Sequence, residues 1–201
     1  MTVYLEITLL PDVDISLNFL LQKVYQQLHL RFVDMQRENA ALAVQKGGLQ
    51  PIGVSFPKYN SLANTLGDKI RLFAENVATL ERFSAKHTFR KLSDYVHVTN
   101  IREVPENVTT FACFQRVQLK SSNTRLARRK AKRENISFEE ALFKLRTHAE
   151  QRTDLPFMSI KSASNGENFR LFVVYSQKTC ASDELVFSTY GLSDKSTVPI
   201  F

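Results

Sequence analysis

The sequence predicts an α+β fold, because segments with the two-residue period of strands alternate with segments that have the longer period of helices. The chain has 201 residues, enough for one domain or two small ones. The character of the sequence changes near Pro105, and the surplus positive charge lies beyond it. We therefore expect an N-terminal domain over residues 1–108 and a C-terminal α+β domain over residues 109–201.

The first two elements of the N-terminal domain are predicted to be a strand and a long helix. Residues 3–9 alternate well enough for a half-buried strand, which Pro11 ends. A helix is expected from about Ser16, because apolar residues then recur at helical spacing. No helix breaker precedes Gly47, so this helix could extend to about Val44.

Five shorter segments complete the first domain and lead into the second. Apolar runs at 52–56 and 70–73 predict two strands, and residues 76–85 are predicted to form a helix. Another strand is expected at 94–99, and a longer one at 108–119. Strand, helix, two strands, helix, strand is the order of a ferredoxin-like αβ sandwich. We therefore expect the N-terminal domain to be ferredoxin-like.

The C-terminal domain is predicted to contain two helices followed by strands. Polar residues at 121–124 are N-cap candidates for a basic helix over about 124–134. Ser137 and Glu140 make a capping box for a second helix over about 138–150. Strand-like runs follow at 158–161, 169–174 and 185–189, and residues 164–167 are predicted to form the hairpin turn between the first two runs.

The predicted basic helix carries a continuous stripe of positive charge. Residues 116–152 hold eleven Lys or Arg and four Glu, a net of +7 that equals the charge of the whole chain. Like charges one turn apart weaken an isolated helix, so the stripe favours a nucleic acid or phosphate partner over a solvated face or an anionic membrane. Spacings of three and four residues place on one face Arg125, Arg128, Arg129, Lys132 and Arg133, with Lys130 nearby.

Composition argues against several other classes of protein. No apolar run is long enough to span a bilayer, and the N-terminus lacks the basic start of a signal peptide. The two cysteines lie far apart, and none of the four histidines has a metal-ligand spacing to another His or Cys. No phosphate-binding loop or dinucleotide fingerprint is present. We therefore expect a cytoplasmic nucleic-acid binder without a metal, a cofactor or a membrane span.

Five side chains are candidate site residues, although each has an ordinary structural explanation. His29 lies at the border of the apolar face of the first helix, where a histidine is often structural. Tyr190 ends a predicted strand and Phe169 lies within one, so both could simply pack in the core. Ser162 and Ser164 flank a turn, where hydroxyls commonly bond the backbone.

Taken together, segments from both ends of the chain resemble the CRISPR-associated endoribonuclease of type I-F systems, which cuts CRISPR precursor RNA at each repeat hairpin. The family fold joins an N-terminal ferredoxin-like domain to a C-terminal domain that carries an arginine-rich helix. The matching stretches keep their order and are YLEITLLPD (4–12), Leu28-His29, GVSFP (53–57), FQRVQLKS (114–121), DLPFMSIKSASNGENFRLF (154–172), STYGLS (188–193) and VPIF (198–201).

The resemblance implies a role for each matching position. His29 matches the catalytic histidine, and Tyr190 the tyrosine that helps to place it. Ser162 matches the serine that holds the attacking ribose hydroxyl, and Ser164 the second active-site serine. Arg116 and Gln118 match the pair that reads bases near the foot of the stem, and Phe169 matches the aromatic that stacks on its last base pair. The residues that match the helix laid in the major groove are Arg128, Arg129, Lys132 and Arg133. Lys120 and Arg125 are also expected to bind RNA.

The implied reaction needs no metal or cofactor. The 2′-hydroxyl upstream of the scissile phosphate attacks it, giving a 2′,3′-cyclic phosphate and a 5′-hydroxyl. A neutral imidazole can take the proton near neutral pH. The implied partners are the repeat stem-loop RNA, in precursor and mature guide, and the other subunits of the type I-F surveillance complex; the isolated protein is expected to be a monomer.

Two other functions remain open from the sequence. The chain could be a non-catalytic RNA-hairpin-binding subunit of the same kind of assembly, or an unrelated ferredoxin-like protein that binds RNA or DNA. Lys132 stands where the family commonly has arginine, and lysine lacks the planar fork that pairs with guanine. Whether Lys132 reads a base or only binds phosphate is therefore open, as is the role of residues 31–50.

Overall fold

The structure is a computed structural model that describes residues 1–38, 50–119, 123–146, 153–162 and 166–201. It divides into two compact units: a main unit, Met1–Arg116 with Leu155–Phe201, and a helical unit, Val117–Asp154. The predicted domain boundary, between residues 108 and 109, falls inside the main unit and separates its two sheets. It does not coincide with the boundary between the two compact units, and it stays a prediction. We describe each unit by itself.

The first sheet of the main unit is built from the N-terminal half of the chain. Its strands are ordered β2-β3-β1-β4, with β5 also pairing with β1, and the strand pairs are antiparallel. The predicted order of strand, helix, two strands, helix, strand is observed. The elements are β1 (Val3–Leu9), α1 (Leu17–Glu38), β2 (Gly53–Ser55), β3 (Lys69–Ala74), α3 (Val77–Phe83), α4 (Ala85–Thr88), the 3-10 helix η1 (Arg90–Leu92), β4 (Val96–Val98) and β5 (Arg102–Glu103).

Helix α1 places one apolar stripe against the core. Its buried residues recur every three or four positions, as a single inward face requires. The predicted extension toward Val44 lies outside the described residues. The buried residues of α1 are Leu20, Leu21, Val24, Tyr25, Leu28, His29, Phe32 and Met35.

The second sheet contains strands from the C-terminal half, in the order β7-β8-β6-β9. Its strands are β6 (Phe111–Val117), β7 (Phe157–Lys161), β8 (Asn168–Lys178) and β9 (Val198–Pro199). The predicted pairing of β7 with β8 is confirmed by an antiparallel register from Phe157↔Phe172 to Lys161↔Asn168. The turn between them lies partly outside the described residues.

The strand predicted at residues 185–189 is wrong. Phe187 makes only an isolated bridge with Gln50. The neighbouring backbone is satisfied by loop contacts instead, because the Val186 amide donates to Ser196 Oγ and the Ser188 amide donates to the Leu192 carbonyl. The apolar run reflects burial of Phe187, which is 2% exposed, rather than a sheet ladder.

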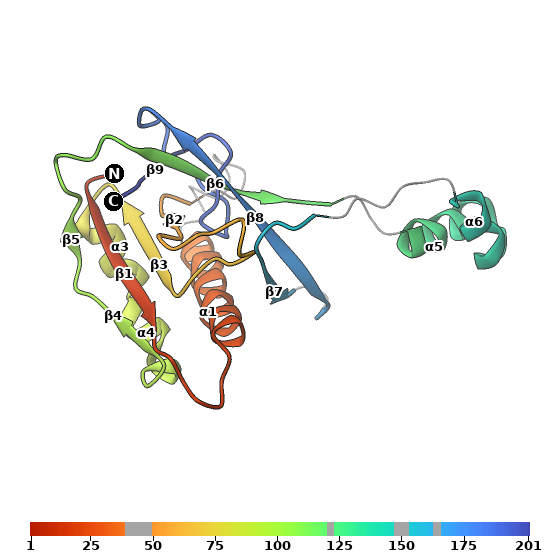
Figure 1. The fold of residues 1–201 in the computed structure, drawn as a ribbon, viewed down its shortest axis with the longest axis horizontal. Helices are drawn as coiled ribbons and strands as arrows, with labels where there is room; N and C mark the ends of the chain where they lie inside the picture. Colours follow the sequence, from red (N-terminus) through yellow and green to blue (C-terminus); the bar gives the residue numbers. More distant parts are fainter. Residues whose placement is uncertain (39–49, 120–122, 147–152, 163–165) are drawn as a thin grey trace. The chain divides into compact units, whose positions relative to one another are not determined.

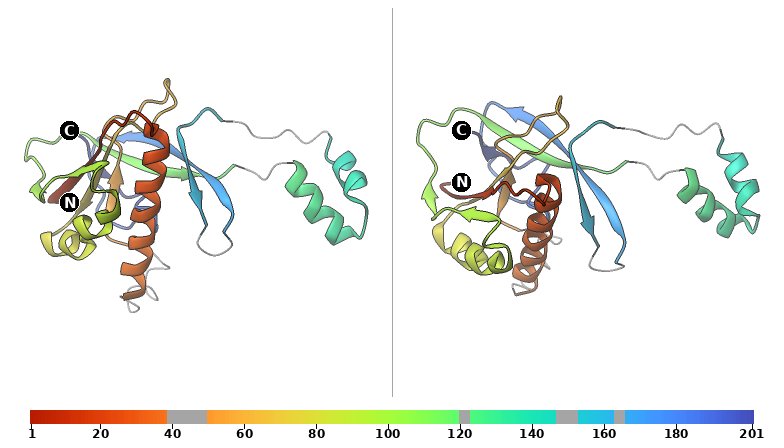
Figure 2. Two further views of the ribbon diagram at one scale, coloured as in Figure 1. Left: turned by 90° about the horizontal axis from the view of Figure 1, so that it is seen from below. Right: turned by 60° about the horizontal axis from the view of Figure 1, so that its bottom comes forward.

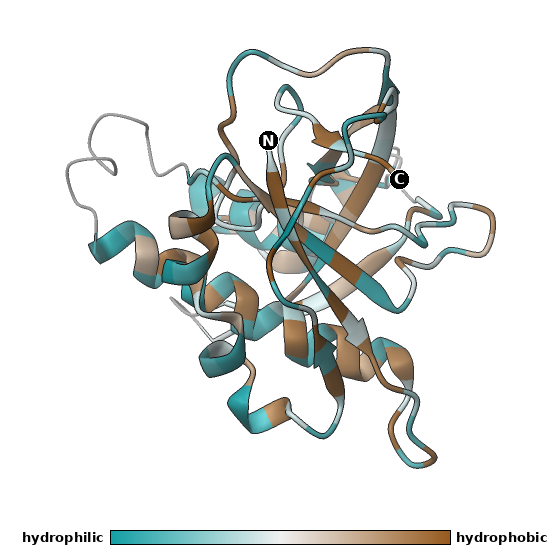
Figure 3. Cartoon of the chain, turned by 90° about the vertical axis from the view of Figure 1, so that its left-hand side faces the viewer, coloured by the Kyte–Doolittle hydropathy of each residue, from teal (hydrophilic) through white to brown (hydrophobic). Residues whose placement is uncertain are grey.

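One hydrophobic core joins both sheets. Helix α1 contacts β1, α3 and also β7, so it lies against both the first sheet and the hairpin of the second (Figures 1 and 2). Figure 3 shows hydrophobic residues along the strands of the main unit and on the helix turns beside them. Side chains from both halves of the chain meet in this core, among them Leu5, Phe32, Phe56, Phe114 and Val173. The core fixes α1 relative to the strands around it.

The helical unit contains α5 (Asn123–Glu134) and α6 (Phe138–Lys144), which contact each other. The basic helix begins one residue before the predicted start. At α6, the Glu140 amide donates to Ser137 Oγ at 3.1 Å, so Ser137 is the predicted cap. Helix α6 ends at Lys144 rather than near residue 150, and residues 147–150 lie outside the described part. Among the described residues of this unit, only Ala127 and Ala141 are buried.

Candidate active site and basic helix

His29 is held on the inner face of α1 with one ring nitrogen committed to the backbone. The side chain is 8% exposed, and its Nδ1 lies 2.8 Å from the Thr189 carbonyl oxygen. A carbonyl only accepts hydrogen bonds, so Nδ1 carries the proton when the ring is neutral. The lone pair is then on Nε2. The Thr189 carbonyl therefore selects the tautomer in which Nε2 can act as a base.

The surroundings of His29 keep its ring uncharged. Burial lowers its pKa from the ordinary value of 6.5, and the positive charge of Arg116 lowers it further, while the hydrogen bond to Thr189 opposes both effects. The net shift is downward, so most of the imidazole is neutral at pH 7. A neutral, oriented imidazole is the form that can abstract a proton from a hydroxyl.

Tyr190 covers the face of the His29 ring. The two ring centroids are 4.2 Å apart and the planes differ by 9°, which is a parallel stack. Tyr25, also on α1, donates its hydroxyl to the Tyr190 carbonyl at 2.6 Å. Burial raises the pKa of Tyr190, so its phenol stays protonated near neutral pH. The stack and the hydrogen bond restrict the imidazole to one orientation.

The turn that contains Thr189 and Tyr190 depends on Gly191. The Gly191 amide donates to the Ser188 carbonyl at 2.8 Å, and its carbonyl accepts from the Val54 amide at 2.8 Å. Gly191 has a φ of 70°, and a Cβ at this position would lie 2.1 Å from Val54 Cγ2. Only glycine fits both the backbone angle and the space. This turn therefore sets the position of the Thr189 carbonyl and of the Tyr190 ring.

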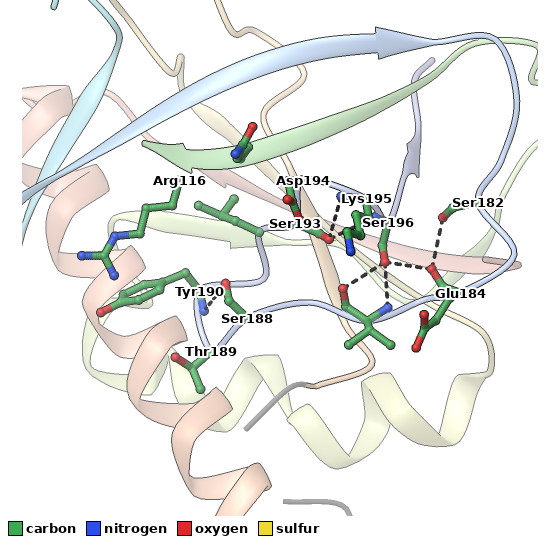
Figure 4. Close-up of a pocket in the computed structure, with 13 residues that line it drawn as sticks. Arg116, Ser182, Glu184, Ser188, Thr189, Tyr190, Ser193, Asp194, Lys195 and Ser196 are labelled. Atoms are coloured by element: carbon green, nitrogen blue, oxygen red, sulfur yellow. Dashed lines mark hydrogen bonds between the residues drawn. The ribbon is translucent and has the colours of Figure 1, made fainter. Parts of the chain in front are cut away.

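Arg116 and Phe169 complete an aromatic and cationic cluster around Tyr190. The Arg116 guanidinium carbon lies 5.1 Å from the centroids of both the Phe169 and Tyr190 rings. The Phe169 ring meets Tyr190 edge-on at 6.4 Å. Figure 4 shows the Arg116 side chain beside the Tyr190 ring. Helix α1, strands β6 and β8, and the turn at 188–191 thus bring four of the predicted site residues together.

A cavity of about 760 Å³ opens beside Arg116, Thr189 and Tyr190 (Figure 4). Serine hydroxyls that line it bond the backbone. Ser196 Oγ lies within hydrogen-bonding distance of the Glu184 and Val186 carbonyls, and Ser193 Oγ accepts from the Lys195 and Ser196 amides. The carboxylates of Glu184 and Asp194 also line it. These contacts fix the C-terminal loops behind the turn at 188–191.

Ser162 directly follows β7, whose end is tied to α1 by Gln26. The Gln26 amide side chain accepts from the Lys161 amide at 2.9 Å and donates to the Lys161 carbonyl at 3.1 Å. Gln26 lies one helical turn before His29. The Ser162 amide donates to the Glu167 carbonyl at 2.8 Å, which closes the hairpin. Ser164 lies outside the described residues, so its predicted role stays a prediction.

Three residues of this arrangement were not predicted from the sequence. Tyr25 and Gln26 act through hydrogen bonds to distant segments, and Thr189 acts through a carbonyl that every residue has. The only available signal was that Tyr25, Gln26 and His29 fall within one turn of each other on a predicted helix. That spacing does not identify their partners, which lie more than a hundred residues away in the chain.

The basic stripe of α5 is exposed, as expected for a binding surface. Its five members, Arg125, Arg128, Arg129, Lys132 and Arg133, are exposed, while Ala127 faces the interior of the unit. Lys130 lies between the two faces and is 3.7 Å from Glu134. Arg133 is 3.1 Å from the same carboxylate, so part of the positive charge at the end of α5 is neutralised. Gln118 is exposed just past β6, and Lys120 lies outside the described residues.

Metal ligands and membrane spans were searched among the described residues only. No group of three His, Cys, Asp or Glu side chains in this part of the chain could hold a metal ion. None of its helices is long and apolar enough to cross a membrane.

Comparison with known proteins places the chain beside CRISPR-associated proteins. A family model described as "CRISPR-associated protein (Cas_Csy4)" matches residues 4–201. The CRISPR-associated endonuclease Cas6/Csy4 of Escherichia coli (strain UTI89 / UPEC) is 35% identical over 198 residues, covering 98% of both chains. The protein of the same name from Pseudomonas aeruginosa (strain UCBPP-PA14) is 32% identical with the same coverage. A solved structure of a Cas6-related gene product from Pyrococcus furiosus covers 100% of this chain and 99% of its own at 11% identity, with a TM-score of 0.39.

Proposed function

Because the chain belongs to the Cas6/Csy4 family of CRISPR-associated endonucleases, we propose that it cleaves precursor CRISPR RNA at the base of the repeat stem-loop without a metal ion. The proposed products carry a 2′,3′-cyclic phosphate and a 5′-hydroxyl. The enzyme then stays bound to the mature guide RNA within the type I-F surveillance complex.

In the proposed reaction, His29 acts as the general base. Its Nε2 takes the proton of the 2′-hydroxyl upstream of the cut, and the 2′-oxygen attacks the adjacent phosphorus. The bond from phosphorus to the 5′-oxygen breaks, and that oxygen takes a proton from water and leaves as a hydroxyl, while the imidazolium returns its proton to the solvent. Ser162 holds the attacking hydroxyl in line with the scissile bond. Such positioning can lower the activation barrier by several kcal/mol, on the order of 7–11 kcal/mol at best.

The observation that carries this proposal is the tautomer of His29. The hydrogen bond from Nδ1 to the Thr189 carbonyl assigns the lone pair to Nε2, and burial keeps the ring neutral. The Tyr190 stack holds the ring in place. A histidine with only a packing role has no need of all three. Together they supply a base of fixed orientation.

The proposed RNA contacts use the aromatic and basic side chains around this centre. Phe169 would stack on the last base pair of the stem, and Arg116, held against it, would read a base beside that pair. The α5 stripe would lie in the major groove, where Arg129 has the fork that guanine accepts. An A-form major groove is too narrow for a helix except where a short stem ends, so this arrangement favours hairpins.

We also infer a ferredoxin-like N-terminal domain over residues 1–108, followed by a C-terminal domain over residues 109–201. The strand order β2-β3-β1-β4, with one helix after β1 and another after β3, supports the first assignment. The second sheet, formed by β6 to β9, supports a division between β5 and β6.

The decisive test uses labelled repeat hairpins in excess EDTA. We expect cleavage with a cyclic phosphate on one product and a 5′-hydroxyl on the other. A hairpin whose upstream 2′-hydroxyl is replaced by hydrogen should bind and remain uncut, because the stem contacts persist. A requirement for added magnesium, or a 5′-phosphate product, would exclude the proposed chemistry. Binding without any cleavage would instead favour a non-catalytic hairpin-binding subunit.

A further inference from the structure

A second cavity, of about 710 Å³, lies between α1 and the β7–β8 hairpin. Ser162 and Gln26 line it, so it begins at the serine expected to hold the reacting ribose. Lys23 and Lys161 line it as well, and the side-chain amide of Asn168 adds further hydrogen-bonding groups. Among the described residues that line this cavity there is no carboxylate, whereas Glu184 and Asp194 line the cavity of Figure 4. Its charge suits an anionic ligand.

An exposed aromatic ring stands at this cavity. Phe19, near the start of α1, is 50% exposed and lines the cavity wall. The Lys23 ammonium lies 4.9 Å from the centroid of its ring. A half-exposed phenylalanine adds little to the core, but it offers a base a surface for stacking, and an adjacent lysine can pair with phosphate. An aromatic ring beside a cation is a recurrent arrangement in single-stranded RNA sites.

A third cavity, of about 620 Å³, adjoins the second one on the neighbouring face of α1. Lys23 and Leu30 line both cavities, so the two meet along one ridge of the helix. Arg90 and Lys91 line its far wall, on η1. In the described part of the chain, the carboxylate that lines this cavity is Asp34, which lies 3.8 Å from Arg37. Among the described residues, no ion pair engages Lys23, Arg90 or Lys91, so their charges are not offset by a close carboxylate.

We infer that this path, from Ser162 past Phe19 and Lys23 to Arg90 and Lys91, binds the single-stranded RNA that continues beyond the scissile phosphate. The inference rests on the proposed function, because Ser162 identifies the end at which the reacting ribose lies. The stem would then contact Arg116 and Phe169, while the strand leaving the phosphate would follow α1. Binding of the downstream strand would hold the leaving group in line with the attacking hydroxyl.

The test measures the affinity of uncleavable 2′-deoxy hairpins, so that it does not depend on cleavage. Three RNAs are compared: one with a single downstream nucleotide, one with a longer downstream single strand, and one with an upstream single strand of equal length. The wild type should bind the second RNA most tightly. Phe19→Ala should weaken that RNA alone by about five- to tenfold, because one stacked base is lost.

Matched variants separate stacking from exposure and charge. Phe19→Tyr should retain the downstream preference and Phe19→Leu should lose it, because only the first keeps an aromatic face. Leu62→Ala removes an apolar side chain that is 98% exposed, more than Phe19, and that lies outside both cavities, so this variant should change nothing. Lys23→Ala and Lys91→Ala should each weaken the downstream-flanked RNA by about threefold at low salt and less at high salt, whereas Lys178→Ala should not discriminate between the RNAs.

The outcomes are distinct for the path and for the proposed function. Three results would overturn the inference: variants that lose affinity equally for all three RNAs, a wild type that prefers the RNA with the upstream strand, and variants that change no affinity. The third result would favour a protein partner for this face. Failure of the wild type to cut the matching 2′-hydroxyl hairpins would overturn the proposed function instead. In that case a downstream preference that depends on Phe19 would still establish the path as a binding site.

Discussion

The main unit buries its candidate base in a large hydrophobic core, whereas the described part of the helical unit exposes the arginines of α5 and buries few residues. His29 is 8% exposed and contacts residues from distant segments, including Thr189 and Tyr190. The α5 stripe is exposed, and Ala127 and Ala141 are the buried residues among those described in its unit.

This difference follows from what each region is proposed to do. Proton transfer requires the base to be within hydrogen-bonding distance of one hydroxyl, and only dense packing holds a side chain to that tolerance. Attraction of a polyanion depends on charge, which acts over about 10 Å at moderate salt and tolerates movement. Substitutions that displace His29 should therefore reduce the rate of cleavage, and substitutions on α5 should reduce affinity.

Among substitutions that leave His29 in place, Gly191→Ala should have the largest effect. The new Cβ would collide with Val54 and oppose the positive φ, so the turn would move together with the Thr189 carbonyl and the Tyr190 ring. A displacement of that order costs catalysis about 100-fold. Single-turnover cleavage should fall by this factor, while hairpin affinity stays within a few-fold.

Gly67→Ala is the matched control for this substitution. Gly67 also has a positive φ, of 80°, and a Cβ there would lie 2.5 Å from Lys58 Cβ, so it should lower the melting temperature in a similar way. Gly67 takes no part in the site, and its variant should cleave at the wild-type rate when folded. Equal losses of cleavage in both variants would show that the turn at 188–191 has only a folding role.

Arg129→Ala should act on affinity rather than rate. If Arg129 pairs with a guanine edge, its loss should cost about 1–3 kcal/mol of binding and relax discrimination at one stem position. Binding to the cognate hairpin and to single base-pair swaps measures both quantities. A slower saturated cleavage rate with unchanged affinity would contradict the division between the two units.

The pH dependence of cleavage tests the electrostatics around His29. Burial lowers its pKa below 6.5, so the neutral base is already dominant at pH 7 and is lost only as the pH falls through that lowered value. The kcat/KM for hairpin cleavage should be flat from neutral pH to about 8 and should fall about tenfold per pH unit on the acid side. An inflection well above 6.5 would contradict a desolvated imidazole.

Lys130→Ala should give the smallest effect. Lys130 lies off the exposed stripe and 3.7 Å from Glu134, which already offsets part of its charge. We expect a loss of affinity below about threefold, equal for all hairpins and reduced by salt, because only phosphate attraction is involved. Equal, sequence-independent losses for Lys130→Ala and Arg129→Ala would show that α5 is an electrostatic clamp without base reading.

Sequence periodicity predicted much of the fold because burial imposes it. The apolar stripe of α1 and the alternation of β1 identified both elements, and Ser137 identified the start of α6. The apolar run at 185–189 led to a wrong strand prediction. Phe187 is buried by packing, whereas the amides of its neighbours Val186 and Ser188 donate to Ser196 Oγ and to the Leu192 carbonyl. The short strands β5 and β9 were missed, since two-residue strands carry no period.

The site was predicted only in part, for a related physical reason. His29, Tyr190, Arg116 and Phe169 do come together, but their grouping followed from the resemblance to a family rather than from spacing. The Thr189 carbonyl that fixes the His29 tautomer is a backbone atom, so no side-chain pattern reveals it. The role of Gln26 could not be predicted either, because its hydrogen-bond partner is the backbone of Lys161.

The most direct test of His29 as the base is cleavage by His29→Ala with and without added imidazole. The variant should lose about 100-fold or more of its single-turnover rate, bind the 2′-deoxy hairpin within a few-fold of the wild type, and regain part of its rate when imidazole is supplied. His97→Ala, which removes an exposed histidine on β4, should behave as the wild type. Undiminished cleavage by His29→Ala, or a loss of binding as large as the loss of rate, would contradict the account.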